Sequence, residues 1–247
     1  MCLQIISRLF KSPSHPSAEQ KRIAAILDAA DALRAKRRES LAQLDTLLQS
    51  TFLDMFGDPR ETSGNGNRVP LGEITTIIMG QSPPGSSYNQ TGIGPPLLNG
   101  PTEFGLRFPK EIQWTDAPTK LCNKNDILFC VRGATAGRMN MADKEYCLGR
   151  GVAAIRPHDQ GQVAFIFSVL NSLYDYFQSR GVGSTFINIS KKDLETLSFP
   201  KPSPNLQHRF AVIVESVEQQ KARLREHLAE LDTLFASLQQ RAFTGDL

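Results

Sequence analysis

Few side chains of this 247-residue chain are spaced for bond-making chemistry. An enzyme that methylates a flipped base would need Asp, Asn or Ser followed by Pro-Pro-aromatic, and a Gly-rich cofactor loop after a strand. Gln81-Ser82-Pro83-Pro84-Gly85 comes near this pattern, but Gly85 stands where the aromatic residue is required. No Gly-x-Gly loop precedes the segment, so we expect a proline-rich turn here.

Other catalytic and metal-binding patterns are missing from the sequence. There is no Gly-x4-Gly-Lys-Ser/Thr phosphate loop, and we find no nuclease-like Asp…Glu-x-Lys arrangement. The four histidines are too scattered to predict a shared metal site. Cys130 and Cys147 lie in or near expected strands, where cysteine is usually a buried small apolar residue. The sequence therefore predicts no catalytic residue, no metal and no cofactor in this chain.

Several loops in the middle of the chain carry side chains that suit nucleic-acid binding. Arginine forks onto guanine O6 and N7, glutamine and asparagine pair with adenine, and lysine, serine and threonine reach phosphates. The candidate DNA-contacting residues are Gln81, Ser82, Tyr88, Arg132, Thr135, Arg138, Arg150, Ser184, Thr185, Lys191 and Lys192. Surface loops are polar in most proteins, so no single residue of this set decides the function.

Composition narrows the class of protein. The 28 Lys and Arg against 25 Asp and Glu give a net charge of +3, which is weakly basic for a DNA binder that acts alone. Basic residues would have to gather on one face, or partners would have to help. No apolar run approaches the ~18–20 residues of a membrane span, and the first residues make a poor secretory signal. Four cysteines without a Cys-x-x-Cys pair indicate no disulfide framework, so we expect a cytoplasmic protein without a membrane partner.

Two long helices are predicted at residues 17–56 and 205–243. The first contains no glycine or proline, and its apolar residues follow a heptad, with Arg37 as an imperfection on the seam. At 1.5 Å per residue it is ~55–60 Å long, which requires a partner helix. The predicted coiled-coil interface consists of Ile23, Leu27, Ala30, Leu41, Leu44, Leu48, Phe210, Ile213, Val217, Leu224, Leu228 and Leu231.

The two helices are copies of one element. LAQLDTL at 41–47 matches LAELDTL at 228–234, a shift of 187 positions that also aligns Phe56 with Phe243. Pro13 then meets Pro200, so residues 1–15 resemble the tail of another middle domain. We therefore expect a half-length version, or the second half, of a longer duplicated protein.

The middle, about 68–200, changes character. Short β-branched and aromatic runs at 71–79, 126–131, 151–157 and 185–189 predict strands between turns. Residues 163–180 are apolar at helical spacing and predict a buried helix. The expected fold class is α+β: a globular mixed domain flanked by two long helices that form an antiparallel coiled coil.

Residues 19–59, EQKRIAAILDAADALRAKRRESLAQLDTLLQSTFLDMFGDP, closely resemble the spacer region of type I restriction–modification specificity subunits. The order of motifs that follows is also similar. These motifs are Val69-Pro-Leu-Gly-Glu, Asn125-Asp-Ile-Leu-Phe, Gly133-Ala-Thr-Ala-Gly-Arg138, Gly181-Val-Gly-Ser-Thr-Phe-Ile-Asn-Ile189, Lys192-Asp-Leu and Phe199-Pro200. The resemblance covers nearly the whole chain. It implies a domain remnant at 1–15, a spacer helix at 16–57, a target recognition domain at 68–200 and a second spacer helix at 204–244.

The resemblance also implies a function and partners. Such a subunit reads part of a bipartite sequence in double-stranded DNA, and methyltransferase subunits dock on its coiled coil. They methylate adenine with S-adenosylmethionine, and a motor-nuclease subunit joins for restriction. The chain itself would be non-catalytic, and it would form a homodimer or pair with another half-subunit.

Two other functions stay open from the sequence. A degenerate half-subunit would only scaffold or regulate the complex through its coil, without sequence preference on DNA. A small DNA methyltransferase would bind S-adenosylmethionine by itself. The sequence also leaves open whether the long helices pair within one chain or between two.

Overall fold

The computed structural model of the protein describes residues 17–60, 68–179 and 187–244. The expected domain remnant at 1–15 and the candidate residues Ser184 and Thr185 lie outside these ranges. The chain divides into two compact units, one of residues up to 50 together with those from 214 onward, the other of residues 51–213. We describe each unit by itself.

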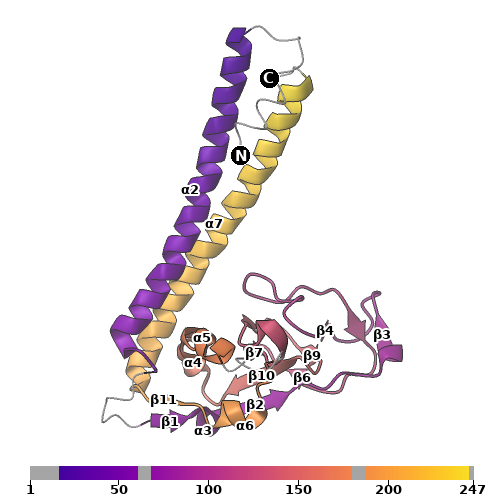
Figure 1. Ribbon diagram of the computed structural model, residues 1–247, viewed down its shortest axis with the longest axis vertical. Helices are drawn as coiled ribbons and strands as arrows, with labels where there is room; N and C mark the ends of the chain where they lie inside the picture. The colour runs from indigo at the N-terminus through magenta and orange to yellow at the C-terminus, as the bar shows by residue number, and fades with distance from the viewer. Residues whose placement is uncertain (1–16, 61–67, 180–186, 245–247) are drawn as a thin grey trace. The chain divides into compact units, whose positions relative to one another are not determined.

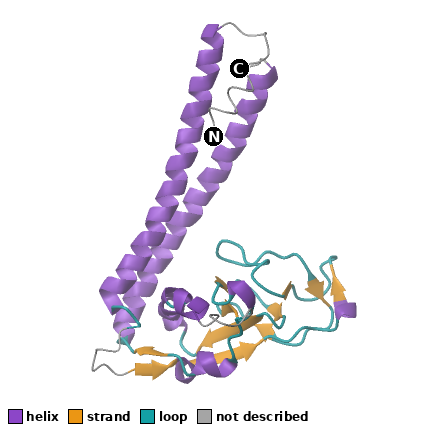
Figure 2. Ribbon diagram, in the orientation of Figure 1, coloured by secondary structure: helices purple, strands orange, loops and turns teal. Residues whose placement is uncertain are grey.

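The described residues form the predicted α+β mixture with two long helices (Figures 1 and 2). The helices are α2 (Ser17–Phe56), α3 (Leu71–Ile74), α4 (Val163–Ser172), α5 (Tyr174–Ser179), α6 (Lys191–Glu195) and α7 (Pro204–Thr244), with 3-10 turns η1 (Gly85–Ser87), η2 (Gly133–Thr135) and η3 (Gln160–Gln162). The strands are β1 (Arg68–Pro70), β2 (Thr75–Met79), β3 (Tyr88–Asn89), β4 (Leu97–Leu98), β5 (Trp114–Thr115), β6 (Leu121–Cys122), β7 (Ile127–Cys130), β8 (Met139–Met141), β9 (Tyr146–Leu148), β10 (Val152–Pro157) and β11 (Ser198–Pro200).

In the first unit α2 and α7 lie antiparallel within one chain (Figure 1). In the structure the two long helices thus pair within one chain. Covered side chains recur every three or four residues along both helices, as a heptad requires. Ile23, Leu27, Ala30 and Val217 are buried; Leu41, Leu44, Leu48, Leu224, Leu228 and Leu231 are half-buried.

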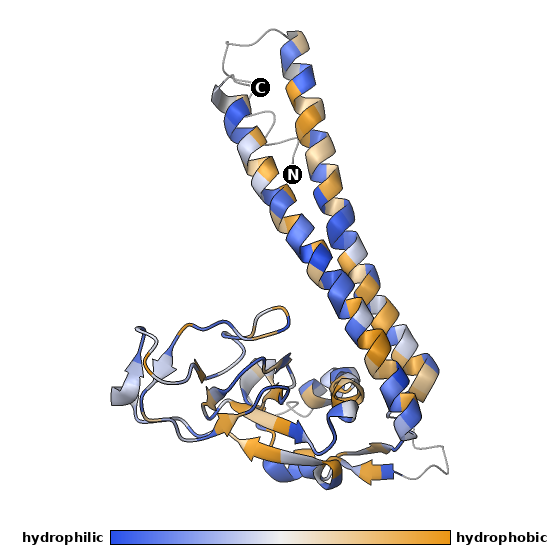
Figure 3. Cartoon of the chain, turned by 180° about the vertical axis from the view of Figure 1, so that it is seen from behind, coloured by the Kyte–Doolittle hydropathy of each residue, from blue (hydrophilic) through white to orange (hydrophobic). Residues whose placement is uncertain are grey.

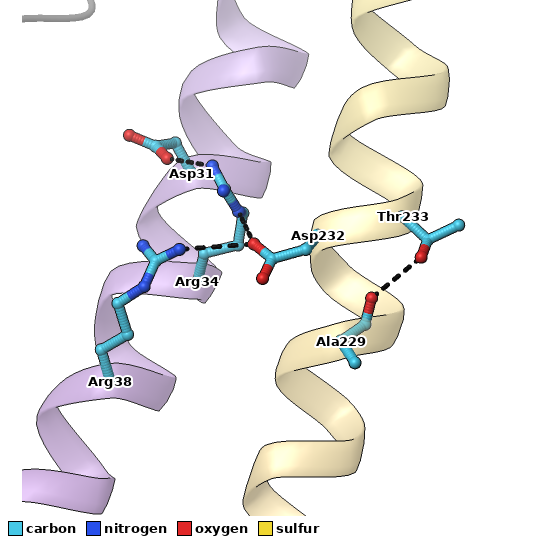
Figure 4. A network of polar contacts seen from close by, with 6 residues as sticks. All are labelled: Asp31, Arg34, Arg38, Ala229, Asp232 and Thr233. Carbon is cyan, nitrogen blue, oxygen red and sulfur yellow. Dashed lines mark hydrogen bonds and ion pairs between the residues drawn. The ribbon is translucent and has the colours of Figure 1, made fainter. Parts of the chain in front are cut away.

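Charged side chains interrupt this apolar seam. The Arg34 Nε lies 2.6 Å from an Asp232 carboxylate oxygen (Figure 4). The Arg34 guanidinium lies 4.3 Å from the centre of the Phe235 ring. Arg38 also reaches Asp232, at 3.3 Å. Further along the coil, the buried Lys221 Nζ lies 2.6 Å from an Asp45 oxygen. Each of these cross-helix ion pairs fixes how far one helix is shifted along the other.

The two ion pairs are the same contact made twice. Arg34 and Lys221 are 187 positions apart, and so are Asp45 and Asp232. Each pair therefore joins a cation at one place in the repeat to a carboxylate at another, once in each direction, as an approximate twofold axis requires. The internal repeat of the sequence is thus also a symmetry of the coil.

We predict that Lys221→Glu destabilises the coil. The change would place three carboxylates together, because the Lys221 ammonium also contacts Glu218 at 2.7 Å. Removing the partner of these groups should cost about 1–3 kcal/mol, measured as a lower thermal midpoint of the helical circular-dichroism signal. The double variant Lys221→Glu with Asp45→Lys should recover part of the loss. The exposed Lys36→Glu is the matched control, and equal midpoints for it and Lys221→Glu would contradict the prediction.

The second unit is built on the four-stranded antiparallel sheet β2-β10-β7-β8. A second sheet, β4-β9-β6, contributes Leu98, Tyr146 and Leu148 to a core shared with Leu128 and Ala154 of the first sheet. The central strands β7 and β10 are almost entirely buried and colour as apolar in Figure 3. This shared core excludes water from the centre of the unit.

The cysteines belong to this interior. Cys130 and Cys147 are buried, as predicted, and Cys122 is buried with them. Burial raises the pKa of the Cys122 thiol to about 12, since the charged thiolate is poorly solvated there. The thiol therefore stays protonated near neutral pH and acts as a small apolar group.

Two local predictions are wrong, and a third lies partly outside the described residues. Residues 71–74 form α3, where Leu71 N bonds the Leu197 carbonyl (2.7 Å), and strand β2 starts only at Thr75. The helix expected at 163–180 breaks at Leu173 into α4 and α5. Of the strand expected at 185–189, the described residues make only a single bridge, from Asn188 to Arg132. At α3 a hydrogen bond to a distant segment holds the backbone, and local hydrophobic spacing does not reveal such a bond.

A cluster of five phenylalanines completes this unit: Phe52, Phe56, Phe165, Phe199 and Phe210. Neighbouring ring centres lie 4.9–6.1 Å apart, the range of favourable aromatic pairs. Gly57 ends α2 in a left-handed conformation (φ 74°), and Ser203 with Pro204 begins α7. Phe210 was expected in the coil, and its ring contacts place it in this cluster with the last residues of α2.

Candidate nucleic-acid interface

One end of the four-stranded sheet gathers the loops singled out from the sequence. Ala153 at the start of β10 pairs with Met79 at the end of β2, and Val152 pairs with Cys130 at the end of β7. Phe129 of β7 in turn pairs with Met139, the first residue of β8. The loops that leave or enter the strands there, at 80–82, 131–138 and 149–151, must therefore lie together. We call this place the loop end of the sheet.

Backbone contacts hold Gln81, Ser82 and Arg150 close to one another. The Gln81 N–H donates to the Leu148 carbonyl (2.8 Å), and the Arg150 N–H donates to the Ser82 hydroxyl (3.3 Å). The Thr119 hydroxyl donates to the Gln81 carbonyl and brings a further loop to this place. The side chains of Gln81 and Arg150 are exposed, while Ser82 is half-buried and braces the turn.

Two amide side chains that sequence reasoning missed lie at the same end. The Asn99 Nδ2 donates to the Gln113 Oε1 at 3.3 Å. A Cβ on Gly149 would come within 2.5 Å of the Asn99 Oδ1, and one on Gly151 within 2.3 Å of the Asn99 carbonyl. Asn99 therefore lies directly beside the loop that carries Arg150. The glycines on both sides of Arg150 indicate in the sequence that another segment of backbone approaches closely, but they do not identify that segment as Asn99.

The arginines of the 131–138 loop stand next to these groups. The Val131 N–H donates to the Gly151 carbonyl (3.0 Å), which ties this loop to the one that holds Arg150. Arg132 and Arg138 are exposed. Thr135 is half-buried, its hydroxyl lies 3.6 Å from the Cys130 sulfur, and its carbonyl accepts from the Arg138 N–H at 3.0 Å. Thr135 thus shapes the turn that presents the two arginines.

The remaining candidates differ in placement. Lys191 and Lys192 are exposed at the start of α6. The Ile189 N–H donates to the Val131 carbonyl at 2.9 Å, which places the start of α6 near the loop end. Lys191 also pairs with Glu195 at 3.4 Å. Tyr88 belongs to the separate β3–β5 pair and is half-buried, with its hydroxyl 3.3 Å from the Pro83 carbonyl.

The charge of these segments is strongly one-sided. The described residues 80–82, 98–100, 119–120, 131–138, 149–151 and 187–192 contain no Asp or Glu. They contain six basic residues: Lys120, Arg132, Arg138, Arg150, Lys191 and Lys192. The chain is nearly neutral overall, yet these segments place positive charge beside amide side chains. A nucleic acid would need this arrangement, because its phosphates are negative and its base edges form hydrogen bonds.

We predict that Gly80→Ala disrupts the loop end. A Cβ at Gly80 would lie 2.2 Å from the Gly149 carbonyl oxygen and 2.4 Å from that of Val152, so backbone would have to move. The expected loss is about 1–3 kcal/mol of unfolding free energy, measured by urea denaturation. Gly85→Ala, where a Cβ meets nothing within 4 Å, is the matched control and should be neutral. Equal stability of the two variants would show that the loops are not packed as described.

Comparison with known proteins identifies the family. Residues 66–232 match the family model for the type I restriction modification DNA specificity domain. The chain belongs to this family. The resemblance inferred from residues 19–59 and the motifs after them is thereby confirmed. A curated relative, the putative type I restriction enzyme MjaX specificity subunit of Methanocaldococcus jannaschii, is 30% identical over 252 residues, which cover 96% of this chain and 59% of the relative.

Solved structures of specificity subunits share the fold. The HsdS subunit of Thermoanaerobacter tengcongensis is 33% identical with a TM-score of 0.62, covering 94% of this chain and 60% of that one. A chain from a study of complex assembly and conformational transition of the type I R-M system is also 33% identical, with a TM-score of 0.66 and coverages of 94% and 61%. The S subunit of M. genitalium, 20% identical with a TM-score of 0.62 over 92% and 61%, shows the likeness of fold alone. This specificity chain thus spans about three-fifths of each relative.

Neither a membrane-spanning helix nor a cluster of metal ligands is present among the described residues. No described helix is long and apolar enough to cross a membrane. Within residues 17–60, 68–179 and 187–244, no three His, Cys, Asp or Glu side chains are grouped as metal ligands would be.

Proposed function

We propose that this specificity chain reads DNA sequence with the loop end of its four-stranded sheet. One observation carries the proposal: segments far apart in the sequence bring exposed amide and guanidinium groups together, and these segments contain six basic residues and no Asp or Glu. Phosphate contacts by the basic residues would set the position of the duplex, and the amides and an arginine would reach base edges. The non-catalytic character of the family agrees with this division of labour.

The side chains suggest which bases are read. Asn99, Gln113 and Gln81 carry the amides that pair with adenine N6 and N7. Arg150 stands between two glycines beside Asn99 and suits the O6 and N7 of guanine. Arg132, Arg138 and the lysines suit phosphates. We therefore expect the recognised half of a bipartite target to contain both adenine and guanine.

The coil is proposed to hold the partners. Leu47 and Leu234 occupy equivalent places in the two copies of the repeat, and each is 49% exposed. Such a duplicated apolar position suits two copies of one protein, and we assign them to adenine methyltransferase subunits that bring S-adenosylmethionine. A motor-nuclease subunit would join the same assembly for restriction. We expect the complex to work in the cytoplasm, on chromosomal and incoming DNA.

The decisive experiment is to express the chain with its methyltransferase subunits and map methylated adenines across a genome. We expect a defined motif. In the mapped complex, Arg150→Ala should relax the preference at one guanine by about 1–3 kcal/mol, while the exposed Gln160→Ala, beyond the opposite end of β10, should leave the motif unchanged. Methylation without a motif would favour the scaffold function, and methyl transfer by the chain alone would favour an enzyme.

We further propose that two reading surfaces act together, supplied by a homodimer or by another half-subunit. The ~55–60 Å of α2 corresponds to roughly one and a half turns of DNA, which suits a ruler between two half-sites. A homodimer predicts a symmetric split motif, and analytical ultracentrifugation of the complex should find two specificity chains. A motif with one half only, from a complex with one such chain, would contradict the dimer.

A further inference from the structure

The loop of residues 99–113 carries, besides the amide pair at its base, an exposed apolar tip. Leu106 is 83% exposed and Phe108 41% exposed. The Arg107 guanidinium lies 5.3 Å from the centre of the Phe108 ring. A single exposed leucine is common on protein surfaces and needs no explanation. Here, however, a leucine, an arginine and an aromatic ring are grouped at the tip of one loop.

Hydrogen bonds hold this tip firmly. The Gly105 N–H donates to the Phe108 carbonyl at 3.1 Å, closing a tight turn in which a Cβ at Gly105 would meet that oxygen at 2.3 Å. The buried Asn140 amide donates to the Gly105 carbonyl at 2.9 Å, and the Met141 N–H donates to the Arg107 carbonyl at 3.0 Å. Phe104 packs against the core. Leu106 thus projects from a backbone that is anchored to β8 on one side and to the core on the other.

The base of the same loop lies at the loop end of the sheet, where we propose that bases are read. Asn99 and Gln113 join across the neck of the loop, where the Leu97 N–H also donates to the Gln113 carbonyl at 2.8 Å. The strand that anchors the tip, β8, follows directly after Arg138. Met141 is three residues further on, which is about 10 Å along a strand. The tip is therefore within a few base pairs' reach of the residues proposed to read bases.

We propose that Leu106 is a wedge that enters the DNA duplex at a base step, with Arg107 in the groove beside it. This rests on the proposed function of the loop end. Minor-groove proteins unstack and kink DNA with leucine or phenylalanine side chains, and they use arginine to contact the same groove. A wedge must be apolar, exposed and rigidly supported, and this tip meets all three requirements. The kink would let one reading surface cover more of its half-site.

The test uses the assembled complex with its mapped target, carrying 2-aminopurine at each adenine in turn. Apart from the adenines that the methyltransferase subunits flip out of the stack, the wild-type complex should raise 2-aminopurine fluorescence at one step, where the wedge disrupts stacking. Leu106→Ala should abolish this signal and weaken target binding about tenfold, whereas Leu106→Met should retain both. Arg107→Gln should reduce the salt dependence of binding by about one phosphate contact. Ile93→Ala, an exposed residue (59%) of another loop, is the matched control.

The outcomes separate the two proposals. Unchanged binding and fluorescence in Leu106→Ala, with a wild-type complex that reads its motif, overturn the wedge alone. A wild-type complex without sequence preference overturns the reading function as well. If Leu106→Ala instead releases the methyltransferase subunit while DNA contacts persist, the tip is a protein-docking site and the wedge is wrong.

Discussion

The alternating strand direction of one sheet is the constraint on which the proposed reading surface depends. All three pairings of β2-β10-β7-β8 are antiparallel, so the end of β2, the start of β10, the end of β7 and the start of β8 share one edge. The loops that follow or precede these strand ends must therefore lie side by side at that edge. Residues as distant as Gln81 and Arg150 meet because of this register, and the glycines at 80, 149 and 151 allow their backbones to touch.

The coil obeys a different constraint, set by charge as well as by apolar packing. A seam of leucines alone tolerates several shifts of one helix along the other. The Arg34–Asp232 and Lys221–Asp45 pairs are formed only at one shift, because each requires its two groups at the same height. Both ion pairs join the same two positions of the repeat. Duplication of one helix therefore produced two helices that form matching ion pairs with each other.

The features visible in the sequence are those with a local signature. Leucines at heptad spacing predicted α2 and α7, and arginines beside glycines pointed to the turns that carry Arg132, Arg138 and Arg150. Asn99 and Gln113 gave no such signal, since each is an ordinary polar residue until β4, β5 and β9 bring them together. Arg34 and Lys221 lie on the seam, yet their partners are on the opposite helix, so spacing along one helix does not reveal them. The short helix α3 likewise depends on a contact with a distant part of the chain, the hydrogen bond from the Leu71 N–H to the Leu197 carbonyl.

At the loop end, backbone carbonyls approach the glycines closely and hold the loops together. Holding the loops and contacting a ligand are therefore done by different atoms, although many binding surfaces use the same side chains for both. Main-chain atoms hold the loops to one another, whereas the exposed side chains of Gln81 and Arg150 add little to that contact. Replacement of these side chains would therefore leave the framework intact. A protein built in this way can drift from one set of preferred nucleotides to another in single steps, each passing through a folded ancestor.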